Sequence, residues 1–406
     1  MSKPARHYNF ILAGGGAAGL SLAYRLSQSS LRDASLLIID RQLKNRNDHT
    51  WCSWLREPDP FDAIAYRSWD RLSFHGDAGE LRLTLAPYRY RMLRSYDFYR
   101  FTREALASRP GVDFVLGDVE RVVDGPTQAE VWANALVFSG DWVFDSRYGA
   151  PQDCPHDPRY HHLLQHFLGW EIETPTAAFD PDTPSLFDFR TPQRGAMRFF
   201  YVLPYTPNRA LVEYTLFSAN SLPLAEYEDA LRAYIRDVLH IHTYRILDEE
   251  RAAIPMTDAP FPRRAGQRVM TTGTRGGRVK GSTGYAFQRI QQDSAAIIRS
   301  LQTHGHPFAV PTPPRRYHTF DTLLLHILER RGHLGKPIFT ALFKNNPIRR
   351  LFRFLDEEGT LWENIRLMAS VPSWPFIQAW SEVKLKGVFA SGSPLAKTPI
   401  RPKAKN

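Results

Sequence analysis

Cysteine is nearly absent from this sequence, which has only Cys52 and Cys154 among its 406 residues. Two cysteines are too few for the disulfide framework that holds small secreted proteins together, and no CxxC pair is present. We therefore expect the chain to fold in a reducing compartment around an ordinary hydrophobic core, which its length is ample to provide.

Long hydrophobic runs are also missing. No stretch reaches the ~18 apolar residues that a membrane-spanning helix needs, and the apolar run near the N-terminus is too short for a signal peptide. Internal repeats and low-complexity tracts are absent as well. These absences predict a cytoplasmic protein, either free or peripheral to the inner face of the cell membrane.

Positive charge is in excess, because the 52 basic residues outnumber the 42 acidic residues and give a net charge of +10. Such a charge permits contact with anionic lipid or nucleic acid. Two basic clusters also carry aromatic residues, at 87–101 and 346–355. No nucleic-acid-binding motif is present, so we expect a membrane-surface contact and no nucleic acid. The alternative is a solvated surface on which arginine stems cover apolar side chains.

Glycine, by contrast, is concentrated in the segment AGGGAAGL at 13–20. The apolar run 8–13 predicts a buried strand before it, and 17–28 predicts an amphipathic helix after it. The motif GxGxxG falls on Gly14, Gly16 and Gly19. These glycines would allow the tight turn, the approach of a pyrophosphate, and close helix–strand packing, respectively.

The loop has two further parts of a dinucleotide site. The helix that follows it presents free N–H groups and a positive dipole to phosphates. A second strand, 35–40, ends at Asp40, where an acidic residue can bind a ribose hydroxyl. A second glycine-rich segment at 271–287 lies far along the chain, and such a distant contact favours the extended FAD over NAD. The alternative for that segment is an ordinary turn.

The middle of the chain has a different pattern. Between 165 and 217, alternating and apolar runs are separated by turn residues, which predicts a sheet. A helix is expected at 225–239, another from about Thr283, and several more to about 381. The segment HHLLQH has a helical metal-ligand spacing, with His162 and His166 four apart, but no third ligand is evident and no metal is expected.

Six motifs in order resemble the bacterial lycopene β-cyclases of the carotenoid pathway. They are LIIDRQLKNRNDHTWCSW (37–54), VFDSR (143–147), QHFLGWEIET (165–174), FDFRTPQRGAMRFFYVLPYTPNRALVEYTLFS (187–218), GGRVKGSTGYAF (276–287) and FRFLDEEGTLWENIRLMASVPSWPFIQA (352–379). The likeness extends over residues 8–380, nearly the whole chain.

The resemblance implies an α/β fold, with a Rossmann-like FAD-binding domain of the flavin monooxygenase and geranylgeranyl reductase type. A β-sheet substrate domain interrupts it, and C-terminal helices follow. The expected divisions are 1–160 and 265–305 for the FAD-binding domain, 161–264 for the β-rich domain, and 306–395 for a helical, membrane-facing region.

The resemblance also implies reduced FAD as the cofactor, with NADPH as the electron source. The substrate would be lycopene or a related ψ-ended carotene, converted to β-carotene via γ-carotene without net redox change. The oligomeric state is not readable.

The chemistry so implied needs an acid that protonates C2 of the terminal double bond. Glu213, which interrupts an apolar strand, is the expected acid; some relatives have a second acidic residue directly after it, where this chain has Tyr214. Asp48 is a second candidate as acid, base or flavin-shell group, and His49 could carry a proton. The alternative for Glu213 is a sheet-edge or outward-facing glutamate. The alternative for Asp48 and His49 is a polar loop after the strand.

The remaining expected site residues fall into two sets. The cofactor-binding set is Gly14, Gly16, Ala18, Gly19, Asp40, Arg41, Asp145, Gly273, Gly276, Gly277 and Gly284. The substrate-tunnel set is Trp51, Trp54, Phe200 and Tyr285, for which plain hydrophobic core is the alternative.

The C-terminal helices are expected to form the membrane-facing surface. The residues that suggest it are Phe339, Phe343, Leu351, Phe352 and Phe354, beside Lys344, Arg349, Arg350 and Arg353. The acidic run that follows, Asp356, Glu357, Glu358 and Glu363, is expected to be solvated or to cap a helix.

Two other functions fit the same motifs. A flavin-dependent monooxygenase or reductase acting on an isoprenoid lipid would share the fold but change the mass of its substrate. A non-enzymatic escort of prenyl lipids would have no need of bound flavin.

Overall fold

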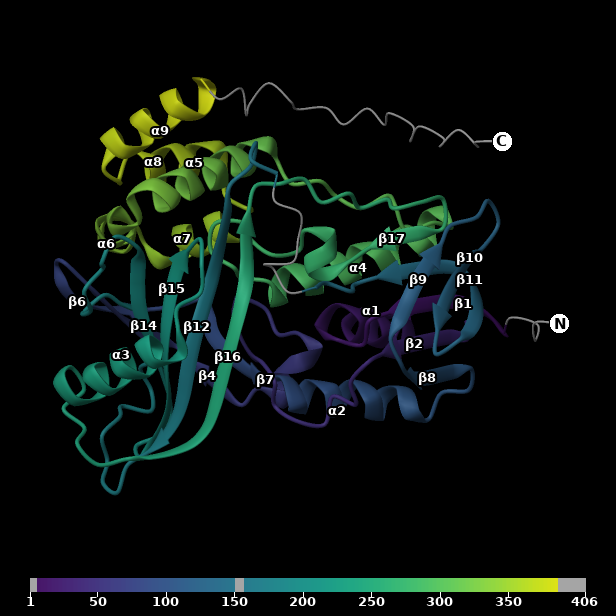
Figure 1. The fold of residues 1–406 in the computed structure, drawn as a ribbon, viewed down its shortest axis with the longest axis horizontal. Coiled ribbons are helices and arrows are strands. Elements are labelled where there is room, and N and C mark those ends of the chain that lie inside the picture. Colours follow the sequence, from purple (N-terminus) through teal and green to yellow (C-terminus); the bar gives the residue numbers. More distant parts are fainter. Residues whose placement is uncertain (1–5, 150–156, 386–406) are drawn as a thin grey trace, which may run out of the picture.

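The computed structural model describes residues 6–149 and 157–385, so Cys154 and the end of the predicted region 306–395 lie outside it. Two seven-stranded sheets and one three-stranded sheet organise the described chain. Figure 1 shows the two larger sheets side by side along the long axis of the molecule, with the C-terminal helices on the lobe opposite the N-terminus.

The first sheet contains the predicted βαβ unit. Its strands are β8 (Val112–Leu116), β2 (Leu36–Asp40), β1 (Arg6–Ala13), β11 (Leu136–Asp145), β10 (Ala129–Ala133) and β9 (Val119–Val123) in spatial order, with β17 (Val269–Thr271) also paired to β11. The pairs that join β8, β2, β1, β11 and β17 are parallel. Ile11 and Leu37 are fully buried, as expected for strands covered on both faces.

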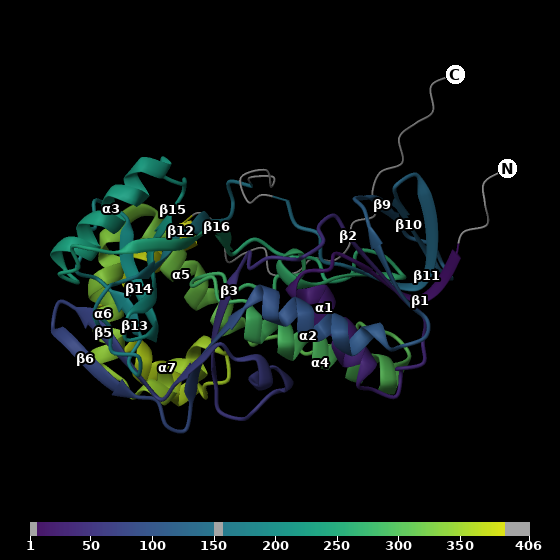
Figure 2. The same ribbon diagram turned by 90° about the horizontal axis from the view of Figure 1, so that it is seen from below.

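Three helices cover one face of this sheet: α1 (Ala17–Ser27), α2 (Ser95–Ala107) and α4 (Phe287–His304). Figure 2 shows them lying together beneath the strands. Strands β8 and β9 are separated by Gly117, which donates its N–H to the carbonyl oxygen of Asp40 at 2.9 Å. Helix α4 begins at Phe287 rather than at Thr283.

The second sheet forms the other lobe. Its strands are β16 (Arg245–Thr257), β12 (His162–Glu173), β15 (Arg209–Ser218), β14 (Met197–Thr206), β13 (Ser185–Asp188), β5 (Arg71–Gly76) and β6 (Gly79–Thr84) in spatial order. The sheet predicted after residue 165 is therefore present. It also includes β5 and β6, which precede residue 160, so the predicted divisions of the chain do not coincide with the sheets.

The two faces of the second sheet have different partners. Helix α3 (Leu224–Asp237) covers the face that presents Trp170, Phe200 and Tyr214. On the opposite face, residues such as Tyr201 and Leu203 pack toward the helices α5 (Arg315–Arg331), α6 (Gly335–Asn345) and α7 (Ile348–Leu355). His162 and His166 lie on β12, not on a helix, so the helical metal spacing does not apply to them.

The remaining elements connect the lobes or end the chain. A small sheet of β3 (Thr50–Leu55), β7 (Arg89–Arg94) and β4 (Arg67–Trp69) lies between them, with the 3-10 helix η1 (Pro60–Ile64) after β3. Helices α8 (Leu361–Met368) and α9 (Ser373–Leu385) come last. Within the described residues, no helix has the length and apolar character to cross a bilayer.

Candidate active site

The glycine loop joins β1 to α1 in the geometry that its motif predicts. Gly14 has φ +116°, and a Cβ there would lie 2.3 Å from Ser146 Oγ. A Cβ on Gly19 would lie 1.9 Å from the carbonyl oxygen of Gly14, so this residue must be glycine for α1 to pack on the loop. A Cβ on Gly16, the residue before α1, would meet only open space.

Asp40 ends β2 beside this loop. Its Oδ2 accepts the Gly15 N–H at 2.7 Å, and its Oδ1 accepts the Gln42 N–H at 2.8 Å. Asp40 and Arg41 both line the cavity described next. The strand end, the loop and the helix N-terminus are thus assembled as a dinucleotide site requires.

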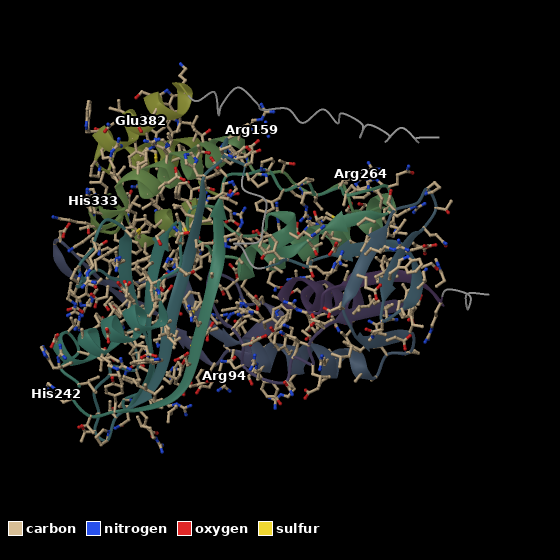
Figure 3. The ribbon with its side chains drawn as sticks, in the orientation of Figure 1. Arg94, Arg159, His242, Arg264, His333 and Glu382 are labelled. Atoms are coloured by element: carbon tan, nitrogen blue, oxygen red, sulfur yellow. The ribbon has the colours of Figure 1, made fainter. Side chains whose placement is uncertain are left out.

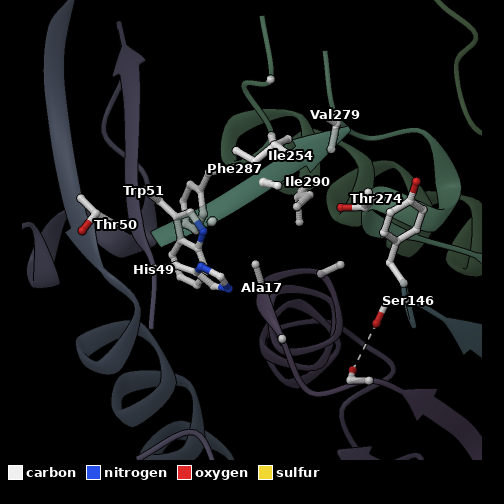
Figure 4. A pocket seen from close by; sticks show the side chains of 18 of the residues that line it. Ala17, His49, Thr50, Trp51, Ser146, Ile254, Thr274, Val279, Phe287 and Ile290 are labelled. Atoms are coloured by element: carbon white, nitrogen blue, oxygen red, sulfur yellow. Dashed lines mark hydrogen bonds between the residues drawn. The ribbon is translucent and has the colours of Figure 1, made fainter. Parts of the chain in front are cut away.

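A cavity of about 720 Å³ extends from the glycine loop to the second sheet. It is lined by the start of α1, the end of β2, strands β3, β12, β14, β15 and β16, and the segment 274–290. Figure 4 shows the N-terminus of α1 at Ala17 facing this space, with Trp51 and Phe287 on one side and Thr274 and Ser146 on the other. Its volume is within the range of small-molecule sites.

The second glycine segment meets the first. A Cβ on Gly273 would lie 2.8 Å from the Cβ of Ala18, so the missing side chain permits this turn to approach α1. Gly276 and Gly277 shape the same turn and do not line the cavity, whereas Gly284 does. The buried oxygens on the cavity wall that have no hydrogen-bond partner among the described residues include Gln165 Oε1 and Thr283 Oγ1.

Glu213 lies on β15 at the far end of this cavity and is 8% exposed. Its Oε1 accepts a hydrogen bond from Thr215 Oγ1 at 2.7 Å. Burial, with the nearby charge of Glu250 adding to it, raises the pKa of Glu213 to about 8, although the Thr215 hydrogen bond acts in the opposite direction. The side chain is therefore predominantly protonated at neutral pH, as an acid catalyst must be.

Glu250 is a second carboxyl group in the same cavity, and the sequence reasoning missed it. It lies on β16, and its Oε1 accepts the Thr50 N–H at 2.9 Å. Burial is the main cause that raises its pKa. Within DEERAAIP, the alternation of Glu250, Ala252 and Ile254 on one face of a strand was the signal that could have found it.

Asp48 and His49 come directly before β3, and only His49 lines the cavity. Asp48 Oδ1 accepts from Ser95 Oγ at 2.8 Å and from Tyr99 Oη at 2.9 Å, and Lys44 pairs with Oδ2 at 3.3 Å. Burial acts to raise the pKa of Asp48. The charge of His49 and the three partners just named outweigh burial, so the pKa lies below its usual value. Burial lowers the pKa of His49. Asp48 is thus a charged group that holds the loop, not a proton donor.

Two of the four predicted tunnel aromatics line the cavity. Trp51 stacks on Phe287 with ring centroids 5.3 Å apart. Tyr285 contacts Trp54 edge-on, with centroids 4.6 Å apart.

The other two tunnel predictions are wrong. Trp54 lies in the core behind Tyr285, where it stacks on Phe352 at 4.6 Å. Phe200 lies on the face of the sheet that α3 covers and stacks on Tyr234 at 3.7 Å. Because side chains alternate along a strand, the neighbouring Tyr201 lines the cavity instead.

Asp145 ends β11 and does not line the cavity. Arg147 Nε and Nη2 donate to its two oxygens at 2.9 Å each, and Arg275 pairs with Oδ2 at 3.3 Å. Arg147 and Arg275 do line the cavity. Asp145 therefore holds the side chains of Arg147 and Arg275 at the cavity wall.

The acidic run after α7 differs from the solvated segment expected. Asp356 accepts a hydrogen bond from Trp54, and Glu357 pairs with Lys280 at 2.9 Å and with Arg289 at 3.1 Å. Glu363 and Thr360 together cap the N-terminus of α8, which is the helix-capping role expected for part of this run. In the described ranges 6–149 and 157–385, no cluster of three or more metal-ligating side chains occurs.

The chain is similar to known proteins over most of its length. The family model described as lycopene cyclase protein matches residues 9–381. Lycopene beta cyclase of Arabidopsis thaliana is 26% identical over 307 residues, which cover 71% of this chain and 59% of that protein. The Solanum lycopersicum protein of the same name is 24% identical over 357 residues, covering 84% and 65%. The chain thus spans about three fifths of the length of these plant relatives.

Solved structures match the fold. A geranylgeranyl bacteriochlorophyll reductase-like protein from Thermoplasma acidophilum has a TM-score of 0.60 at 12% identity, covering 93% of this chain and all of that one. The flavin-dependent monooxygenase PieE, solved with FAD and substrate, has a TM-score of 0.57 at 16% identity, covering 98% and 78%. At these identities the likeness shows the mixed α/β architecture of flavin-dependent monooxygenases and geranylgeranyl reductases. With the family model matched from β1 to α9 and the dinucleotide loop and Glu213 at one cavity, this chain belongs to the lycopene cyclase family.

Proposed function

We propose that this protein is a lycopene β-cyclase, which closes the ψ end groups of lycopene into β-ionone rings. The observation that carries the proposal is the position of Glu213, a buried carboxyl group of raised pKa, in the same cavity as the dinucleotide loop. The plant relatives that the chain resembles are named for this activity. Substrate and product are isomers, so the reaction needs acid–base groups and no oxidant.

Glu213 acts first in the proposed mechanism. Its proton adds to C2 of the terminal C1=C2 bond and leaves a tertiary cation at C1. The C5=C6 bond attacks C1, which forms the C1–C6 bond and moves the cation to C5. Loss of the C6 proton restores a double bond between C5 and C6. The raised pKa keeps the Glu213 proton available when substrate arrives.

The cavity wall near Glu213 suits a polyene end group. Leu203, Leu211, Phe167 and Ile254 line it. Apolar side chains exclude water, which would otherwise capture the cation as an alcohol. The face of Trp51 or Tyr285 can stabilise positive charge.

FAD fits the other end of the cavity. The glycine loop, Asp40 and the α1 N-terminus would hold the pyrophosphate and ribose. The open space beside Gly16, and the unpaired Gln165 and Thr283 oxygens, leave room and polar partners for more of the group. Reduced FAD, when bound, would supply negative charge that stabilises a nearby cation, and NADPH is the proposed source of its electrons.

The test is expression in bacteria that accumulate lycopene. We expect lycopene to be replaced by γ-carotene and β-carotene, and Glu213→Gln to abolish the change while the protein remains folded and coloured. Unchanged lycopene at good expression would refute the proposal. A product heavier by oxygen or hydrogen would favour the monooxygenase or reductase alternative, and a flavin-free lipid-binding protein would favour the escort.

Lycopene dissolves in the bilayer, so we also propose that the enzyme docks on the inner face of the cell membrane. The surface expected from the sequence cannot serve, because Phe339, Phe343, Leu351 and Phe352 are buried and Phe354 is partly buried. Helices α8 and α9 offer a better surface. Its large exposed apolar side chains are Leu361, Trp362, Ile365, Trp374, Ile377 and Trp380.

This α8–α9 surface has the composition of an interfacial helix pair. Trp362 and Trp374 are 74% and 71% exposed, and tryptophan favours the headgroup level of bilayers. The exposed cations Arg366 and Lys384 lie on the same helices. Glu382 of α9, labelled in Figure 3, is paired with His326 and Arg331 of α5, so α9 is fixed to the protein on that side. Anionic lipid is the partner that this combination fits.

A further inference from the structure

Glu213 and Glu250 stand in one row across three strands. Gly169 on β12 pairs with Glu213 of β15 on one side and with Glu250 of β16 on the other. Residues opposite one another in a sheet present their side chains to the same face, and both glutamates line the cavity. With strands ~4.8 Å apart, their backbone positions are ~10 Å apart.

Gly169 keeps the space between the two carboxyl groups open. A Cβ there would lie 3.4 Å from Glu213 Cβ and Cγ, and 3.0 Å from Leu211 Cδ1. A larger residue would therefore crowd Glu213 and separate it from Glu250. The row thus forms a gap between two carboxyl groups, with Gly169 at its floor.

The two carboxyl groups have different hydrogen-bond partners. Glu250 accepts a backbone N–H, from Thr50, and a backbone N–H can only donate, which favours the carboxylate. Glu213 bonds to the hydroxyl of Thr215, which can donate or accept. Two carboxyl groups that share a cavity resist double ionisation. One proton on the pair is thus assigned to Glu213 and the negative charge to Glu250.

We propose that Glu250 is the base that accepts the C6 proton in the cyclisation, which rests on the cyclase function proposed above. C2, where the proton enters, and C6, where it leaves, are both bonded to C1, so both are within one end group. Glu213 loses its proton to C2, and Glu250 takes the C6 proton as that C–H electron pair forms the C5=C6 bond. One proton enters and one leaves, and transfer from Glu250 back to Glu213 resets the site.

The position of the base determines the type of ring. A cation at C5 can lose a proton from C6, from C4 or from the methyl group on C5, which gives β, ε or γ rings, respectively. A carboxylate held at C6 selects the first. We therefore expect Glu250→Gln to lower β-ring formation by ~100-fold, the scale of general-base catalysis, and to raise the share of ε and γ rings among the residual products.

The experiment measures ring type in carotenoids from lycopene-accumulating bacteria and from purified, flavin-loaded enzyme. Glu249→Gln is the matched control, since Glu249 is the exposed neighbour on the same strand and should leave rate and ring type unchanged. In Glu250→Ala, added formate should restore β rings, because a small carboxylate can occupy the gap. A residue that acts only in folding would show neither the change in ring type nor the rescue.

Wild-type rate and only β rings in Glu250→Gln would overturn the proposal for this residue. So would an inactive, flavin-bearing Glu250→Ala that formate does not rescue. If Glu250→Gln fails to fold, Glu250→Ala with and without formate decides. A wild-type protein that forms no ring refutes the cyclase function itself, so the two failures are distinguishable.

Discussion

Trp54 Nε1 donates a hydrogen bond of 2.8 Å to Asp356 Oδ2, which joins β3 to the end of α7. Burial raises the pKa of Asp356 to about 7, and the Trp54 hydrogen bond only partly opposes this. A carboxyl group whose pKa is higher in the folded state favours folding only while it is protonated. Its contribution is complete below its unfolded pKa of ~4 and is lost as the pH rises to about 7.

Asp356→Asn should therefore stabilise the protein above neutral pH. Asparagine keeps an oxygen that can accept from Trp54 and has no charge to bury. We expect the free energy of unfolding at pH 8 to rise by on the order of 2 kcal/mol relative to the wild type, with little difference at pH 4. Urea unfolding at both pH values measures this. An equal effect at the two pH values would show that ionisation of Asp356 is not the cause.

The raised pKa of Glu213 predicts how the rate of cyclisation depends on pH. Its pKa of about 8 means that the acid is available below that pH and is lost above it. The rate should fall by ~10-fold per pH unit beyond the pKa, since only the protonated form donates. Rates from pH 6 to 10 on flavin-loaded enzyme in lipid vesicles test this. A rate that falls steadily from pH 6 upward would contradict the assignment of Glu213 as the acid.

Substitutions at Gly16 and Gly19 should affect different properties, flavin binding at Gly16 and folding stability at Gly19. A side chain at Gly16 enters open space at the cavity, so Gly16→Val should fold but lose FAD affinity. A side chain at Gly19 collides with the Gly14 carbonyl oxygen, so Gly19→Ala should cost about 1–3 kcal/mol of stability. Flavin absorbance and thermal unfolding distinguish the two. Full flavin content in a folded Gly16→Val would place the pyrophosphate elsewhere.

The glycine loop was predictable because its evidence is local. The apolar strand, the three glycines and Asp40 lie within 33 residues of one another, from Tyr8 to Asp40. Glu213 was predictable for a similar reason, since a carboxyl group in an apolar strand has few roles other than chemistry, and a family motif contains it. Glu250 was missed because it follows Asp248 and Glu249, and charge alone does not tell which of the three faces the cavity; only its alternation with Ala252 and Ile254 points to it.

The errors came from side-chain direction. Phe200 and Tyr201 are neighbours in one apolar strand, and only the pairing of β14 with β15 decides which of them faces α3. For α6 and α7, the aromatic residues beside basic ones are also core residues that pack on the second sheet. A helix with apolar and basic faces looks the same in sequence whether protein or lipid covers its apolar face, and tertiary packing decides between them.

The α8–α9 surface gives the last prediction, which concerns lipid. Trp362→Ser together with Trp374→Ser removes the two most exposed aromatic side chains of the described residues and should leave the fold intact, since exposed positions contribute little to packing. We expect binding to anionic vesicles to weaken by ~10-fold or more, because each indole contributes buried apolar area at the interface. Cosedimentation with phosphatidylglycerol vesicles at low salt measures it. Leu116→Ser with Leu136→Ser, two positions of 53% and 50% exposure on the other lobe, is the matched control and should bind as the wild type does. Equal loss in both pairs would mean that α8 and α9 are not the docking surface, and wild-type binding in the tryptophan pair would mean the same.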